Sequence, residues 1–179
     1  MKRISFLFCI YTAGCFSIAS LIYAVLKATL YGEQGRVFAA LYLMYEYHNQ
    51  YPYQYILVIA VVYGIIATLW AHFLGRTQTG RTRGLYILGV LALTILCSSI
   101  PGGMLWSLHD MQAGYFPEGS LFWNALSWGA SNGLGIGWFI FILSFPYNIL
   151  CALAGYWLTG YVERKTRNQR QAKSNRSLH

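Results

Sequence analysis

Charged side chains are scarce in this chain. Only 10% of its 179 residues are Asp, Glu, Lys or Arg, and five of them are acidic. Soluble domains carry roughly 25% charged residues. Because 56% of the residues are apolar, the chain lacks the polar groups to cover a soluble surface, and lipid is the expected solvent. At this length one membrane domain is expected.

Acidic residues are absent from the centres of the apolar runs. The five acids are Glu33, Glu46, Asp110, Glu118 and Glu163. Carriers coupled to protons or cations usually need a carboxylate within the membrane, and intramembrane aspartyl proteases need two aspartates. The distribution therefore argues against both classes.

Paired cysteines and paired intramembrane histidines are also lacking. Cys9, Cys15, Cys97 and Cys151 lie within apolar runs without CxxC spacing, as expected of small buried hydrophobes. This argues against a membrane disulfide oxidase, which needs cysteine pairs in its outer loops. His72 is the lone histidine within a predicted span, so no haem, other cofactor or metal is expected.

Four long apolar segments dominate the rest of the sequence. Crossing the roughly 30 Å hydrocarbon core takes about 20 helical residues. The segments that qualify are residues 4–30, 53–75, 85–106 and 133–161. They predict an all-α integral membrane protein, folded as an antiparallel bundle of four transmembrane helices over residues 1–163.

The basic residues predict the orientation of the bundle. All thirteen lysines and arginines except Lys27 and Arg36 fall near the N-terminus, between Arg76 and Arg83, or in the tail 164–179. Cytoplasmic loops carry the excess of Lys and Arg, so both termini are expected in the cytoplasm, with the tail disordered after one more helical turn. The formal charge of +8 then indicates topology and lipid contact rather than nucleic acid. The short loops favour a bacterial cytoplasmic membrane.

The two longer segments outside the membrane, residues 31–52 and 107–132, are rich in aromatic residues. The apolar run Val37–Tyr45 is too short to span, and Leu121–Trp123 follows a polar stretch. Both segments are expected to contain interfacial helices lying on the bilayer.

Small residues recur at helical spacing in each apolar segment. In lipid, helices associate through small residues that let their backbones approach, and proline interrupts a helix. The predicted packing positions are Gly64, Gly103, Gly133, Gly137, Asn148 and Gly155, and the predicted kinks are Pro101 and Pro146. One such face is also suited to another membrane protein or to a second copy of the chain.

Candidates for chemistry lie in the outer segments. Glu46, His48, His109 and Asp110 include both histidines and carboxylates, which act as general acids and bases or bind metals. Their spacing matches no metal motif, and hydrogen-bonded loop packing is the simpler interpretation.

These observations favour a non-enzymatic accessory subunit or scaffold of a membrane complex. One alternative is an enzyme acting on a lipid or lipid-linked substrate at the outer surface, through Glu46, His48, His109 and Asp110. Another is a small transporter or channel subunit whose pathway involves Pro146, Asn148 and Pro101–Gly103.

Overall fold

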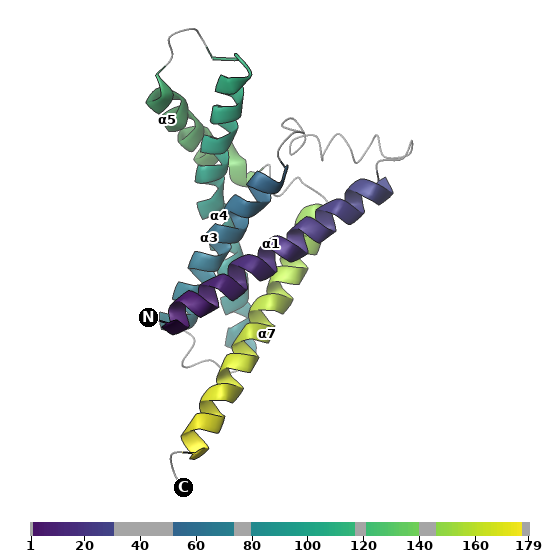
Figure 1. The fold of residues 1–179 in the computed structure, drawn as a ribbon, viewed down its shortest axis with the longest axis vertical. Coiled ribbons are helices and arrows are strands. Elements are labelled where there is room, and N and C mark those ends of the chain that lie inside the picture. Colours follow the sequence, from purple (N-terminus) through teal and green to yellow (C-terminus); the bar gives the residue numbers. More distant parts are fainter. Residues whose placement is uncertain (1, 31–51, 74–79, 117–120, 140–145, 177–179) are drawn as a thin grey trace.

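The computed structural model describes residues 2–30, 52–73, 80–116, 121–139 and 146–176, and every regular element within these ranges is helical (Figure 1). The elements are α1 (Lys2–Leu30), α3 (Pro52–Phe73), α4 (Gly80–Gln112), α5 (Phe122–Asn132), the π-helix η2 (Gly133–Gly137) and α7 (Tyr147–Arg176). The prediction of an all-helical fold is confirmed.

Three helices are long and apolar enough to cross a membrane. These spans are Ile4–Thr29 in α1, Tyr53–Phe73 in α3 and Arg83–Gln112 in α4. They correspond to the first three apolar segments of the sequence. The chain is therefore a small helical protein with the character of a multi-pass membrane protein.

Helix α4 is longer than its apolar segment suggests. The expected span ends at residue 106, with a kink at Pro101, whereas the observed helix continues through Pro101 to Gln112. Proline removes one backbone donor, but neighbouring helices in a membrane protein can compensate for that loss. Pro101 consequently lies inside α4 without ending it.

The fourth apolar segment is not a single helix over its described residues. Its beginning forms η2, which continues α5, and its end forms α7, while Pro146 stands in a turn before α7. The Pro146 carbonyl accepts a hydrogen bond from the Leu150 amide at 3.2 Å. Proline suits this position, since the first residues of a helix need no amide donor.

Helix α5 belongs to the segment expected to lie on the bilayer surface. It runs back along α4, against which it makes extensive contact, and α7 continues toward the opposite end of the molecule beside α1 (Figure 1). The other segment expected at the interface, Val37–Tyr45, lies outside the described residues.

The basic tail is helical further than expected. Helix α7 extends to Arg176, well beyond one turn after residue 164. Arg, Lys and Gln, which are frequent in this stretch, are among the better helix formers.

The core joins α1, α3 and α7 through tyrosines. The buried rings of Tyr11 and Tyr63 pack edge to face, with centroids 5.8 Å apart. The Tyr63 hydroxyl lies 2.7 Å from the Thr159 hydroxyl, which itself donates to the Gly155 carbonyl. A hydrogen bond of this kind contributes about 1 kcal/mol.

Three of the predicted packing positions, Gly64, Gly155 and Asn148, differ in what surrounds them. A Cβ added to Gly64 would meet Thr12 of α1, and one added to Gly155 would lie 2.9 Å from Leu91 Cδ2 of α4. The Asn148 side chain accepts a hydrogen bond from the Ile149 amide at 2.8 Å. The two glycines therefore lie at close helix contacts.

An ion pair links the start of α4 to the middle of α7. Arg83 donates through Nε to a Glu163 carboxylate oxygen at 2.9 Å and through a terminal nitrogen to the Gly160 carbonyl at 2.6 Å. Burial raises the pKa of Glu163, and the neighbouring Arg83 offsets part of this rise. Removal of Arg83 would therefore leave a carboxyl group that ionises less readily.

Candidate functional site

Two rows of small residues bring α4 and the α5–η2 segment into backbone contact. Ser99, Gly103 and Ser107 follow one another at intervals of four on α4, and Gly129 and Gly133 share this interval on the facing segment. Residues four apart lie on the same helix face. A Cβ on Gly103 would meet the Gly129 carbonyl oxygen, and one on Gly133 would meet the Ser99 carbonyl oxygen.

The segment after α5 contributes little side-chain volume. Residues 133–137 read Gly-Leu-Gly-Ile-Gly and form the π-helix η2. Single π-helical turns are rare and frequent at functional sites. A Cβ on Gly135 would have no neighbour within 4 Å, so space remains beside this stretch.

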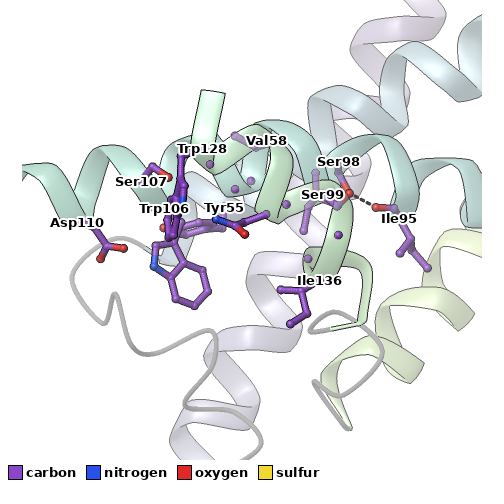
Figure 2. Close-up of a pocket in the computed structure, with 18 of the residues that line it drawn as sticks. Tyr55, Val58, Ile95, Ser98, Ser99, Trp106, Ser107, Asp110, Trp128 and Ile136 are labelled. Atoms are coloured by element: carbon purple, nitrogen blue, oxygen red, sulfur yellow. Dashed lines mark hydrogen bonds between the residues drawn. The ribbon is translucent and has the colours of Figure 1, made fainter. Parts of the chain in front are cut away.

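A cavity of about 780 Å³ opens among α3, α4, α5 and η2. We call it the α3–α5 cavity, and Figure 2 shows its walls. Its lining residues are Tyr55, Val58, Ile59, Ile95, Ser98, Ser99, Gly102, Gly103, Trp106, Ser107, Asp110, Tyr115, Trp128, Gly129, Asn132, Gly133, Gly135, Ile136 and Gly137.

Three serines of α4 contribute hydroxyl groups to this wall. The hydroxyls of Ser98 and Ser99 donate to carbonyls of their own helix, those of Ile95 and Leu96. Ser107 is fully buried, and its hydroxyl has no hydrogen-bond partner among the described residues. The cavity therefore offers a mainly apolar surface with few polar groups.

The chain reverses at one end of the cavity. Gly114 has a φ of 80°, a conformation that glycine adopts without strain. This turn lets the Tyr115 amide donate to the Asp110 carbonyl at 2.9 Å. It places Tyr115 beside the last turn of α4, close to the start of the connection to α5.

Aromatic contact ties the connection after Tyr115 to α5. The rings of Phe116 and Trp128 meet edge to face, with centroids 5.7 Å apart. Trp128 also lines the cavity. The α4–α5 turn and the cavity wall are thus parts of one packed unit.

His109 faces α3. Its Nδ1 lies 3.0 Å from the Tyr55 hydroxyl and its Nε2 lies 3.2 Å from Gln54 Oε1. Because Gln54 Oε1 can only accept, the neutral tautomer with hydrogen on Nε2 satisfies both contacts. The Tyr55 and His109 rings are also 5.7 Å apart. This arrangement joins α3 to α4.

The structure describes two of the four sequence candidates for chemistry, and one of these two lines the cavity. Asp110 lines the α3–α5 cavity, whereas the adjacent His109 does not. Glu46 and His48 lie outside the described residues. Within the described part of the chain, no group of three His, Cys, Asp or Glu side chains is arranged to hold a metal.

Sequence reasoning missed Gln54, Tyr55 and Trp128 as site residues. A signal for the packing of this site was present in the sequence. Ser99, Gly103 and Ser107 have a four-residue spacing that matches the spacing of Gly129, Gly133 and Gly137. Two matching rows of small residues predict that two segments pack together.

Comparison with known proteins finds no matching family, no matching curated protein and no matching solved structure. A functional conclusion must therefore come from the geometry of the α3–α5 cavity and from the chemistry of its lining.

Proposed function

We propose that this protein is a non-enzymatic membrane protein that binds an amphipathic molecule from the bilayer in the α3–α5 cavity. It would do so as an accessory subunit of a membrane complex. The observation that carries the proposal is the cavity itself, about 780 Å³ among α3, α4, α5 and η2. Ligand pockets usually have roughly 300–1,000 Å³ and a mainly apolar lining with few polar groups.

The chemistry of the wall supports binding rather than catalysis. A general base must reach the proton that it removes, but both ring nitrogens of His109 are engaged by α3. The Ser98 and Ser99 hydroxyls are bonded within α4. An enzyme that used His109 as its general base would require a different arrangement of this side chain.

The proposal includes four membrane crossings with both termini in the cytoplasm. In it, α5–η2 and α7 together make the fourth crossing as two half-helices. The course of α5 along α4 and of α7 toward the other end supports this topology (Figure 1). The clustering of basic residues supports the orientation.

The topology is tested with reporter fusions. Alkaline phosphatase, active only outside the cytoplasm, is fused after residue 78, after residue 118 and at the C-terminus. Activity at residue 118 alone is the expected result. Activity at the C-terminus would contradict the fourth crossing.

The binding function is tested on the full chain extracted in mild detergent. Native mass spectrometry should detect a retained amphiphile, and a stoichiometric partner protein should co-purify. Gly135→Phe, which adds a benzyl group to the cavity wall, should remove the amphiphile. The matched control Gly135→Ala should retain it, since its Cβ meets no atom within 4 Å. A chain that carries no amphiphile in a native membrane extract would overturn the proposal.

A further inference from the structure

The α3–α5 cavity is chemically uneven from end to end. The side shown on the left of Figure 2 holds Tyr55, Trp106, Asp110 and Trp128. The right-hand side holds Ile95, Ser98, Ser99 and Ile136. A ligand that fits both ends has a polar or charged head and an apolar tail.

The charge of the aromatic end is negative. Asp110 is the one charged side chain among the described residues that line the cavity. It lies in the last turn of α4, which is the negative end of the helix dipole. This end therefore favours a cationic group over an anionic one.

The aromatic rings specify which kind of cation fits. Trp106 and Asp110 are four residues apart, so they lie on one face of α4, while Trp128 comes from α5 and Tyr115 from the intervening turn. The faces of Trp and Tyr rings attract ammonium groups, and several such rings recognise quaternary ammonium ligands. A cavity lined by one carboxylate and by the rings of Trp106, Tyr115 and Trp128 suits an alkylated ammonium, which is bulky and weakly hydrated.

We propose that the α3–α5 cavity binds an amphiphile with a cationic ammonium head group. The head lies against Asp110, Trp106 and Trp128, and the alkyl chain runs past Ile95 and Ile136. This inference rests on the proposed binding function and adds the charge and chemical class of the ligand. The same chemistry occurs in the ammonium heads of zwitterionic phospholipids and in free hydrophobic ammonium ions.

The test uses the purified full chain in nanodiscs of anionic phosphatidylglycerol. One probe is a long-chain alkyltrimethylammonium ion, and the other is the neutral alkyl glucoside with the same chain. The ammonium probe should bind more tightly than the glucoside. Asp110→Asn, which keeps the side-chain shape, should weaken ammonium binding about tenfold and leave glucoside binding unchanged.

Two further variants control this result. Asp110→Glu retains the charge and should restore ammonium binding to within about threefold of the parent chain. Glu163→Gln removes a carboxylate that pairs with Arg83 away from the cavity, and its binding should equal that of the parent. If Asp110→Asn fails to fold, Trp128→Leu provides the test in its place. The Trp128 side chain is half-exposed, and its replacement should weaken ammonium binding.

The outcomes separate the inference from the function on which it rests. Equal binding of both probes, with no effect of Asp110→Asn or Trp128→Leu, would overturn the cationic head group and leave the cavity as an amphiphile site. Binding of neither probe would overturn both. Competition by phosphatidylethanolamine or phosphatidylcholine added to the nanodiscs identifies a phospholipid source, and its absence identifies a free ammonium ion.

Discussion

The backbone contact between α4 and α5–η2 gives a sharp prediction about two neighbouring glycines. A Cβ on Gly103 would lie 2.7 Å from Gly133 Cα and 2.9 Å from Gly133 N, and closer still to the Gly129 carbonyl oxygen. These are backbone atoms, so no side-chain rotation can relieve the overlap. A Cβ on Gly102 would meet no atom within 4 Å.

The size of the effect follows from these distances. Carbon atoms prefer separations of about 3.5–4.0 Å, so in Gly103→Ala the segments must move apart by about 1 Å from the 2.7 Å contact. Overpacking of this kind destabilises a protein by about 1–3 kcal/mol. Gly102→Ala should be neutral or stabilising by up to about 1 kcal/mol, because alanine favours helix.

The assay is unfolding in mixed micelles at increasing dodecyl sulfate, followed by far-ultraviolet circular dichroism. Gly103→Ala should unfold at a lower denaturant fraction than Gly102→Ala, with a difference in unfolding free energy of about 2 kcal/mol. Gly103→Ala should also bind less amphiphile, since the displaced segments line the cavity. Equal stability of the two variants would refute the close contact between α4 and α5–η2.

The same assay tests three other contacts. Arg83→Ala should destabilise the chain more at about pH 8 than at about pH 4.5. Burial already raises the pKa of Glu163, and loss of Arg83 raises it further. The cost of burying an unpaired Glu163 carboxylate is therefore absent while the group is protonated, and it appears as the pH rises through the folded-state pKa. An equal loss of stability at both pH values would contradict this. Tyr63→Phe, which removes the contact with the Thr159 hydroxyl, should lower the unfolding free energy by about 1 kcal/mol; an unchanged midpoint would show that this bond contributes nothing. His109→Ala should lower the unfolding free energy by about 1–3 kcal/mol with unchanged amphiphile affinity, and the reverse pattern would assign His109 to the ligand.

The sequence was most informative where the composition of a single segment is enough to predict a helix. A run of apolar residues long enough to cross a bilayer suffices to locate the helices in 4–30 and 53–75, whatever their neighbours do. The third run was also located, but its end was not, because the helix continues past residue 106 into the polar residues up to Gln112. Local composition predicts that such helices exist more reliably than it predicts the residues at which they begin and end.

The fourth segment shows why composition alone was insufficient. Average hydropathy over residues 133–161 is the same whether the chain is one helix or two with a turn at Pro146. The close contact of Gly133 with Ser99 depends on how α5 docks on α4, which no single segment encodes. For that reason the sequence did not predict that α5 and η2 pack along α4.

The candidate site was still less accessible to prediction. His109 and Asp110 are neighbours in sequence, but successive residues on a helix point about 100° apart. Consequently His109 meets Tyr55 while Asp110 lines the cavity. Distinguishing these directions requires knowing where α3 and α5 lie.

The contact between α4 and α5–η2 also limits how this protein can diversify. Where backbone meets backbone, as at Gly103 and Gly129, nearly every replacement adds atoms with nowhere to go. The opposite wall, with Val58 and Ile59 of α3, consists of side chains whose length and branching can change without separating two helices. Substitutions that adapt the cavity to a different ligand are therefore expected on α3, while Gly103 and Gly129 stay unchanged.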